Sequence, residues 1–346
     1  MLRLGNLELD LPAIQAPISG YSDWAMRQLA REFGAPLTFS GLMLAKSAVH
    51  ARLWRQGGFR LGEQERPLGG QLLGRDPEEM ARAAEVLAAK GYDLIDLNFA
   101  CPAPKVLARG RGGALLREPE LAVAIFRRVR ARVSLPLTIK LRTAFAEAGD
   151  GGEGFWRIAA AAAAEGVDGL IVHGRAVAQR YRGHADWGPI AEVKRRFPRT
   201  VVLGSGDLLS AEAAVQRLGE SGVDGVVIAR GAIGNPWIFR ELRALLAGEP
   251  APPPPTLTEV GQVMDRHFTQ VLELYERRRA IGYFRKFCVG YCRRHPRRRK
   301  ALLALMAAET AEHVRLTIAD WFLRADGAPV ERLESAREST AEEYAP

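Results

Sequence analysis

Short apolar segments recur along the first 245 residues of the chain, and helical patterns separate them. Each segment has the length of a buried strand, and most are rich in leucine, isoleucine or valine. Eight strand–helix units within about 240 residues suit a closed (β/α)8 barrel rather than a shorter doubly wound sheet. The pattern therefore predicts an α/β fold, a (β/α)8 TIM barrel, with strands at 13–18, 37–43, 68–73, 94–98, 137–141, 169–173, 201–204 and 225–229.

The intervening helices carry start and stop signals. In RDPEEMARAAEVLAAKG, Asp76 suits the N-cap, Pro77 the first helical position and Gly91 the C-terminal end. Two segments of the chain are similar in sequence, EGVDGLIVHGR at 165–175 and SGVDGVVIARG at 221–231. Both copies run from a helix end through a turn into a strand, and both finish in polar residues. Barrel enzymes keep their active sites at this end of the strands.

A proline-rich segment, EPAPPPPT, stops the barrel pattern. Four consecutive prolines cannot continue a helix and predict a stiff, extended spacer. The chain after it shows only helical patterns, at 257–279, 280–292 and 300–323. We therefore expect a catalytic barrel domain at 1–248, a linker at 249–256, a small all-helical C-terminal domain at 257–325 and a polar, frayed tail at 326–346.

The predicted helical region carries most of the chain's net positive charge. The chain carries a net charge of +9, yet residues 266–300 alone hold twelve Arg or Lys and two Glu, so the rest of the chain is close to neutral. Such a concentrated basic block indicates a polyanionic partner, nucleic acid above all. The alternative is a solvated helix face in an arginine-rich protein, because arginine outnumbers lysine 42 to 7.

Composition limits the class of protein further. A hydrophobic content of 47% is enough for a sizeable core and excludes wholesale disorder. Three cysteines cannot build a disulfide framework, which indicates a reducing compartment. The N-terminus MLRLGNLELDLPAI alternates leucine with polar residues, and no window reaches the roughly 20 apolar residues of a membrane span. We expect a cytoplasmic protein.

Polar residues gather where the predicted strands end, and a barrel brings all those ends to one mouth. Two of the loops, GSGD and ARGAIGNP, are glycine-bearing turns before helices, where backbone N–H groups and the helix dipole bind phosphate. The candidates are the QAPISGYSD loop, Gln71, Asn98, Cys101, Lys140, Arg142, His173, Arg175, Ser205, Gly206, Asp207 and Arg230.

A phosphate site beside Gln71, Lys140 and His173 suits a flat, polar-edged cofactor such as FMN. An amide can hydrogen-bond the pyrimidine edge of the ring, and a cation near N1–C2 stabilises the anionic reduced flavin. Each residue also has a structural alternative. Lys140 could be an ion-pair partner inside the barrel, His173 a core histidine and Gln71 a strand-end cap. Their shared place at one mouth favours the cofactor.

Cys101 lies just beyond a predicted strand end, before a glycine-rich loop whose basic residues could attract phosphates. No second cysteine or histidine stands nearby at metal-ligand spacing. A nucleophilic role would need a base held close. Proton donation to a carbanion opposite a hydride donor needs only one positioned acid. By contrast, Cys288 and Cys292 share one face of a predicted helix, and core packing is the favoured reading there.

Taken together, these motifs resemble the tRNA-dihydrouridine synthases, flavin enzymes that reduce a uracil base in transfer RNA. The resemblance covers nearly the whole chain, and its most specific parts are the Asn-x-x-Cys-Pro element and the His-Gly-Arg stretch. The matching segments are APISGYSD (16–23), LNFACPAPKV (97–106), GGALL (112–116), IKLRT (139–143), VHGRAVAQRYRGHADW (172–187), GSGDL (204–208), IARGAIGNPWIFRE (228–241) and, more loosely, YFRKFCVGYCR (283–293).

The resemblance implies reduction of the C5–C6 double bond of specific uridines in tRNA. Hydride would pass from reduced FMN to C6, Cys101 would protonate C5, and NADPH would reduce the flavin again. It implies no metal and no membrane partner, and we expect a monomer. The implied FMN contacts are Ala16, Pro17, Ile18, Gln71, Lys140, His173, Ser205, Gly206, Asp207, Ala229 and Arg230. The implied substrate contacts are Asn98 and Arg142 near the uracil, with Lys105, Arg175, Arg285 and Lys286.

Three positions depart from the family pattern. Ala100 and Ala229 stand where glycine is usual, and Ser205 stands where asparagine is usual. These changes bear on flavin affinity more than on activity. One alternative is an FMN-dependent pyrimidine oxidoreductase of the dihydroorotate or dihydropyrimidine dehydrogenase type, which leaves the basic helices unexplained. A second is a non-catalytic tRNA-binding module, against which the intact Cys101, Lys140 and His173 argue.

Overall fold

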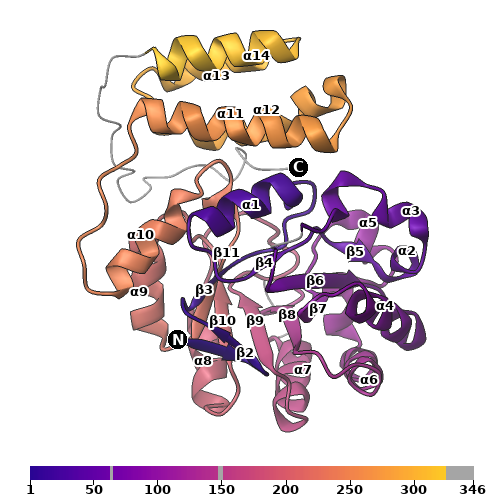
Figure 1. Ribbon diagram of the computed structural model, residues 1–346. Coiled ribbons are helices and arrows are strands. Elements are labelled where there is room, and N and C mark those ends of the chain that lie inside the picture. Colours follow the sequence, from indigo (N-terminus) through magenta and orange to yellow (C-terminus); the bar gives the residue numbers. More distant parts are fainter. Residues whose placement is uncertain (63–64, 147–150, 325–346) are drawn as a thin grey trace.

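Eight parallel strands form a nearly closed barrel in the computed structural model, which describes residues 1–62, 65–146 and 151–324 (Figure 1). Neighbouring strands pair in chain order, and Gln15 N donates to Leu37 O at 3.1 Å where the first and second strands meet. The predicted (β/α)8 barrel is therefore confirmed. The strands are β3 (Ala13–Gln15), β4 (Thr38–Phe39), β6 (Leu68–Leu73), β7 (Leu94–Phe99), β8 (Leu137–Arg142), β9 (Gly169–His173), β10 (Val202–Ser205) and β11 (Gly225–Ile228).

Two predicted strands are shorter than expected. The first ends at Gln15, and the chain then turns, with Ile18 N donating to the Ser22 hydroxyl at 2.8 Å. The second is broken into β4 and β5 (Met43–Leu44), which both pair with β6 but at different heights. The expected tail at 326–346 lies outside the described residues.

Helices on the outside of the barrel follow the sequence signals. Asp76 accepts from Glu79 N at 2.7 Å, so the predicted N-cap is confirmed. Ser210 caps the helix after β10 in the same way and accepts from Ala213 N at 3.2 Å. The helices are α1 (Trp24–Glu32), α2 (Ala45–Ala48), α3 (Ala51–Trp54), α4 (Pro77–Ala89), α5 (Pro104–Leu107), α6 (Pro119–Arg130), α7 (Glu153–Ala164), α8 (Gly188–Arg196), α9 (Ala211–Ser221) and α10 (Trp237–Leu246), with 3-10 turns η1 (Gly57–Phe59), η2 (Gly112–Arg117) and η3 (Arg230–Ala232).

An N-terminal hairpin of β1 (Leu2–Leu4) and β2 (Leu7–Leu9) closes the end of the barrel where the parallel strands begin. Its leucines are buried against residues of the barrel interior, among them Ile14, Ile171 and Leu203. The alternation of leucine with polar residues in this segment is thus the period of a half-buried strand. With this end closed, the opposite mouth is left for a site.

The C-terminal helices are α11 (Leu257–Leu274), α12 (Arg277–Cys292), α13 (Arg298–Ala307) and α14 (Ala311–Ile318), and a π-helical turn, η4 (Ala319–Leu323), follows them. A single helix over 300–323 was therefore the wrong expectation. The chain breaks after Ala307 because Thr310 caps a new helix, with its hydroxyl accepting from His313 N at 3.0 Å. The expected helix over 257–279 likewise ends at Leu274.

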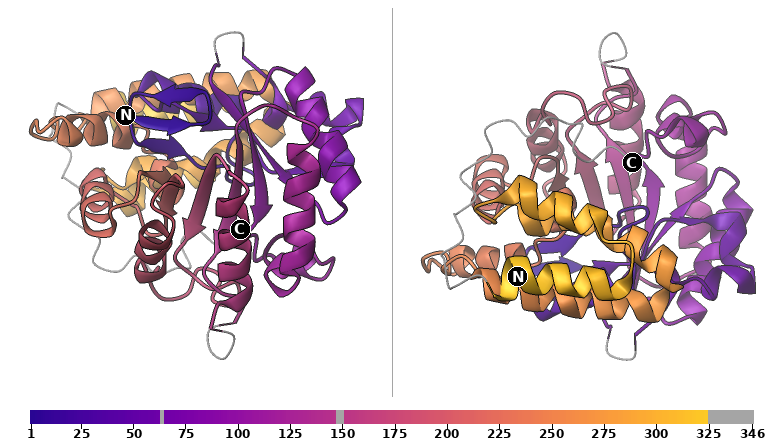
Figure 2. Two further views of the ribbon diagram at one scale, coloured as in Figure 1. Left: turned by 90° about the horizontal axis from the view of Figure 1, so that it is seen from below. Right: turned by 90° about the horizontal axis from the view of Figure 1, so that it is seen from above.

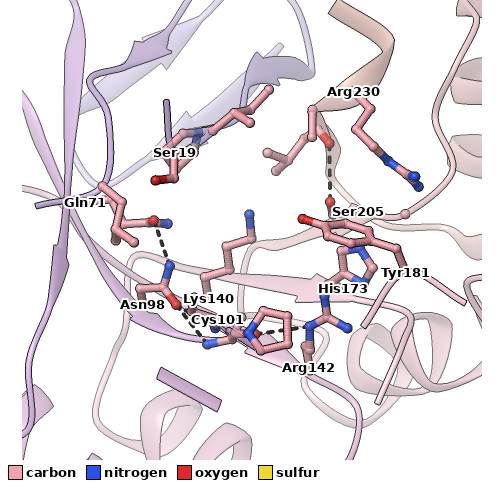
Figure 3. A pocket seen from close by; sticks show the side chains of 18 of the residues that line it. Ser19, Gln71, Asn98, Cys101, Lys140, Arg142, His173, Tyr181, Ser205 and Arg230 are labelled. Atoms are coloured by element: carbon pink, nitrogen blue, oxygen red, sulfur yellow. Dashed lines mark hydrogen bonds between the residues drawn. The ribbon is translucent and has the colours of Figure 1, made fainter. Parts of the chain in front are cut away.

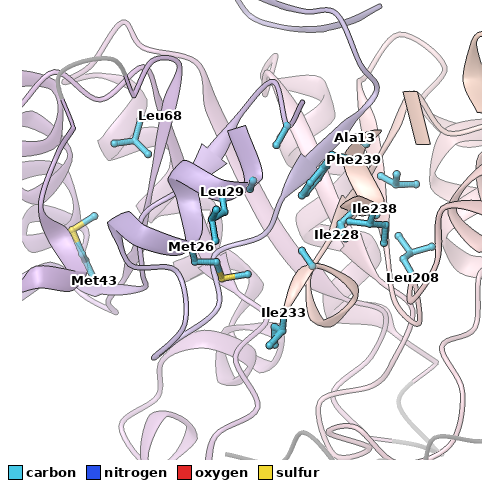
Figure 4. Packing of buried hydrophobic residues seen from close by; sticks show 14 of the residues in the cluster. Ala13, Met26, Leu29, Met43, Leu68, Leu208, Ile228, Ile233, Ile238 and Phe239 are labelled. Atoms are coloured by element: carbon cyan, nitrogen blue, oxygen red, sulfur yellow. The ribbon is translucent and has the colours of Figure 1, made fainter. Parts of the chain in front are cut away.

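These helices lie across one side of the barrel mouth (Figure 2). Helix α12 makes the closest approach, since a Cβ on Gly290 would overlap Ile233 O in the loop after β11. Phe287 meets Tyr21 edge to face, with ring centroids 5.5 Å apart. One continuous core joins the helical region to the outer face of the barrel, and Figure 4 shows the neighbouring packing of α1 and α10 on the strands.

Replacing Gly290 by alanine should therefore destabilise the protein by about 1–3 kcal/mol, because the new methyl group must push α12 away from the Ile233 carbonyl. Gly282 is the matched control: it lies in the same helix, is exposed, and a Cβ there would meet no atom within 4 Å. Gly282→Ala should stabilise the helix by up to about 1 kcal/mol. Urea unfolding measures both changes. Equal effects of the two substitutions would contradict the described contact of α12 with the barrel.

Candidate active site

A pocket of about 920 Å³, open to solvent, occupies the mouth of the barrel (Figure 3). Ala16 is buried just behind its wall, with its N–H donating to Ile228 O at 2.8 Å. The other ten residues predicted to bind the cofactor line it: Pro17, Ile18, Gln71, Lys140, His173, Ser205, Gly206, Asp207, Ala229 and Arg230. So do Asn98, Cys101 and Arg142.

A chain of buried hydrogen bonds crosses the floor of this pocket from β8 to β7. Asp96 accepts from the Thr138 hydroxyl and from Gln71 Nε2, both at 2.7 Å. Gln71 Oε1 in turn accepts from Asn98 Nδ2 at 2.8 Å. Burial raises the pKa of Asp96 to about 6, although these hydrogen bonds and Lys140 favour the ionised form. Because the Asp96 carboxyl accepts from Gln71 Nε2, it fixes which way both amides face.

The backbone around Cys101 is held on both sides. Asn98 Oδ1 accepts from Ala100 N at 3.0 Å and from Cys101 N at 2.9 Å. Arg142 Nε donates to Ala100 O at 3.0 Å, and Gly113 N donates to Cys101 O at 3.0 Å. The thiol-bearing residue is half-buried in the pocket wall. A fixed backbone restricts where the sulfur can lie, as a positioned acid requires.

Three cations and a neutral imidazole face the pocket from β8, β9 and the loop after β11. Figure 3 shows Lys140 pointing into it. Burial lowers the pKa of His173 well below its usual range, and Arg142 and Lys140 lower it further. His173 is therefore neutral at physiological pH. Its Nδ1 has no hydrogen-bond partner among the described residues, so this buried atom is left for a ligand.

Asp207 ties together the loops after β9, β10 and β11. Its carboxylate accepts from Arg175 Nη2 at 2.8 Å, from Arg230 Nη2 at 3.0 Å and from Ala185 N at 2.8 Å. Asp207 and the preceding Gly206 have φ angles of +54° and +132°. Only glycine adopts the second of these without strain, and a Cβ on Gly206 would overlap Ala185. The Asp207 carboxylate therefore fixes the position of two turns in the pocket wall.

Four predicted substrate residues lie outside the pocket lining. Arg175 is only 2% exposed and donates to Arg182 O, Gly183 O and Asp207. Lys105 is exposed on α5. Arg285 donates to Ala308 O within the helical region, and Lys286 donates to Gly20 O. Their contact with substrate stays a prediction. The three departures from the family pattern, Ala100, Ser205 and Ala229, do line the pocket.

Sequence reasoning missed two residues of the site. The ring of Tyr181 lies between Arg142 and Arg230, 5.9 and 4.9 Å from their guanidinium carbons. In the sequence, Tyr181 is only an aromatic residue within RYRGHADW, eight residues after the end of a strand. Its position in space depends on the path of the loop, which the sequence pattern does not give. Asp96 gave a stronger signal, because an acidic residue inside a buried strand needs partners.

In the described parts of the chain, no group of three His, Cys, Asp or Glu side chains could hold a metal, and no helix could cross a membrane.

The fold and the pocket together define a (β/α)8-barrel enzyme whose mouth combines a fixed thiol, cations and turns suited to an anion. Comparison with known proteins narrows the class. The family model described as dihydrouridine synthase (Dus) matches residues 14–321. The chain belongs to the dihydrouridine synthase family. The resemblance read from its motifs is thus confirmed.

Curated relatives carry the same family name. A "Probable tRNA-dihydrouridine synthase" of Mycobacterium tuberculosis H37Rv is 36% identical over 308 residues, which cover 85% of this chain and 78% of the relative. Another from Rhodobacter capsulatus is 36% identical over 84% of this chain and 89% of its own length. Among solved structures, 6-hydroxypseudooxynicotine amine oxidase of Pseudomonas geniculata matches with a TM-score of 0.55 at 13% identity, over 77% of this chain and 52% of its own. That likeness concerns the fold alone.

Proposed function

We propose that this protein is a tRNA-dihydrouridine synthase, which reduces the C5–C6 double bond of uridines in tRNA. The observation that carries the proposal is Cys101, held by its backbone in the wall of a pocket that Lys140, His173 and the Ser205–Asp207 turn also line. The proposal includes NADPH as reductant, a monomeric enzyme and a cytoplasmic location.

The pocket residues fit FMN. The buried Nδ1 of His173 lies in the pocket wall without a hydrogen-bond partner among the described residues, so a polar edge of the cofactor could satisfy it. Gln71 and Lys140 would hold the ring edge, while Ser205, Gly206, Asp207, Ala229 and Arg230 would hold the phosphate. Bound FMN would supply the hydride, taken from NADPH and delivered to C6 of the uracil.

Cys101 would donate its proton to C5 of the uracil. Asn98, which fixes the Cys101 backbone, would also meet the base. Arg142 donates to three carbonyls, of Ala100, Ala176 and Arg180, and so holds the two loops between which the base would enter. Burial lowers the pKa of Arg142 to about 10, which leaves the guanidinium charged at neutral pH.

A uridine in folded tRNA must be extruded to reach this mouth, at a cost of a few kcal/mol. Phosphate contacts from the basic helices would offset it. Arg277, Arg278 and Arg279 are exposed in the first turn of α12, and residues 297–300 are exposed beyond its other end. Phe284, Phe287 and Tyr291 are buried and would not stack on bases.

Lys286 gives a prediction about flavin binding. Its Nζ donates to Gly20 O at 3.3 Å and so secures the loop that brings Pro17, Ile18 and Ser19 to the pocket. Lys286→Met should weaken FMN binding about three- to tenfold without RNA, as measured by flavin fluorescence. Arg278→Met, an exposed change in the same helix, is the control. If both variants bind FMN as the wild type does, Lys286 does not support the loop.

Dihydrouridine formation in unmodified tRNA, with NADPH and the purified protein, tests the proposed function directly. We expect product in tRNA, detected by mass spectrometry of its nucleosides, and no reduction of free uracil or orotate. The second candidate is a small-molecule pyrimidine oxidoreductase, which the same pocket chemistry would serve. Turnover of a free pyrimidine with none of tRNA would establish that candidate and overturn the first.

A further inference from the structure

A second basic surface lies on the barrel itself. Residues 41–60 contain no Asp or Glu, and the 46–60 segment carries Lys46, Arg52, Arg55 and Arg60, with His50 between them. All five side chains are exposed. The charge balance of the whole chain concealed this segment, because acidic residues elsewhere cancel it.

The structure brings the 46–60 segment beside the basic helical region. A Cβ on Gly57 would lie 2.8 Å from Leu274 O, so the segment touches the end of α11. Arg60 also pairs with Glu273 at 3.8 Å, an exposed contact of little strength. The exposed Arg277–Arg279 run begins three residues after Leu274. Two basic stretches that are far apart in the chain thus meet at one junction.

A cleft of about 750 Å³, open to solvent, lies at this junction. Arg55, Arg60 and Lys90 supply cations to its lining, and Trp54 and Phe59 supply aromatic rings. Lys90 Nζ lies 5.6 Å from the Trp54 ring centroid. Glu273 is the acidic residue of the lining. Cations around an apolar floor are the chemistry that binds a nucleotide with its phosphate.

A buried guanidinium fixes this cleft relative to the active-site mouth. Arg27 is fully buried, is ion-paired with Glu65, and donates to Gly58 O at 3.2 Å and Arg60 O at 2.6 Å. The same side chain donates to Ser22 O at 2.9 Å, in the loop that supplies Pro17 and Ser19 to the pocket. A ligand in the cleft would therefore be held at a set position from the mouth.

We propose that the 46–60 segment and its cleft form a second RNA contact, which binds the phosphate backbone of the substrate tRNA away from the reacting uridine. This proposal rests on the proposed function. It assigns tRNA positioning to the barrel as well as to the helical region, with a basic stretch on each side of the junction and the exposed Glu273 and Glu276 between them.

The test is the charge-reversed variant Arg52→Glu with Arg55→Glu, compared with Arg3→Glu plus Arg199→Glu. The control makes the same change in charge with exposed residues at the closed end of the barrel. We expect the KM for tRNA to rise about tenfold in the first variant, with kcat at saturating tRNA within twofold of wild type. The slope of log tRNA affinity against log salt concentration should become about two units less steep. The control should change neither.

Two results would overturn the proposal. The first is a tRNA KM and salt slope equal to those of the control. The second is a rise in the KM for NADPH instead, which would assign the cleft to the reductant's phosphates. Arg55→Gln serves if the double variant does not fold. If the wild type forms no dihydrouridine, the proposed function fails, and tRNA affinity by fluorescence anisotropy still decides the role of this surface.

Discussion

Replacing Cys101 by alanine should slow dihydrouridine formation by about 10²–10⁴-fold while leaving FMN bound and reducible by NADPH. In the proposed mechanism the Cys101 thiol is the acid, and the Asn98, Gly113 and Arg142 hydrogen bonds hold its backbone in the pocket wall. Loss of the thiol would then leave no positioned proton for C5. A positioned general acid contributes about 10²–10⁴-fold, so product formation should fall by that factor. Single-turnover assays with reduced enzyme and tRNA measure it.

Cys288 provides the matched control, because it is a fully buried cysteine of α12 that packs in the helical region. Burial raises its pKa well above the usual range, which keeps it a neutral core side chain. Cys288→Ala should retain the single-turnover rate. Wild-type rates of product formation by Cys101→Ala would end the proton-donor assignment.

Replacing Asp207 by alanine should have the second largest effect, on stability and on flavin retention together. Without the carboxylate, Arg175 is left as a buried guanidinium with carbonyl partners alone. Breaking a buried pair costs about 3–5 kcal/mol. Because Asp207 is 28% exposed, we expect about 2–3 kcal/mol, the lower side of that range. Urea unfolding and the FMN content of the purified protein measure the two effects.

Glu192 is the control for this prediction. Its side chain is about as exposed as that of Asp207 and also pairs with two arginines, but Arg195 and Arg196 are 72% and 53% exposed, whereas Arg175 is 3% exposed. Surface pairs of this kind contribute little, so Glu192→Ala should change neither stability nor FMN content noticeably. Equal effects of the two substitutions would show that Asp207 does not organise the pocket.

The fold could be predicted from sequence because buried parallel strands are continuous apolar runs. Segments such as 68–73 and 169–173 match β6 and β9 residue for residue. Barrel topology then brings the strand ends together without any knowledge of loops. That is why Gln71, Lys140 and His173, from three strands, could be assigned to one mouth.

Features that depend on packing between distant segments could not be predicted in this way. The position of Tyr181 depends on the path of a loop, and the contact of Gly290 with Ile233 depends on how α12 docks. The hydrogen-bond chain from Asp96 to Asn98 depends on side-chain reach across two strands. Patterns along the chain predict local structure, whereas these contacts between distant segments depend on tertiary packing.

The basic charge illustrates the same limit. Counting along the sequence located the block at 266–300 but gave no reason to single out the 46–60 segment. Only the docking of α11 against Gly57 shows that the two share a surface. The charge of the sequence therefore indicates the class of partner. Only the fold shows how far the basic surface extends over the molecule.

Anaerobic reoxidation of the photoreduced protein by unmodified tRNA is the measurement that tests the central claim most directly. The account predicts that tRNA restores the oxidised flavin spectrum rapidly, that free uracil and orotate do not, and that one dihydrouridine forms per flavin reoxidised. A reduced flavin that persists with tRNA but is reoxidised by a free pyrimidine would contradict it.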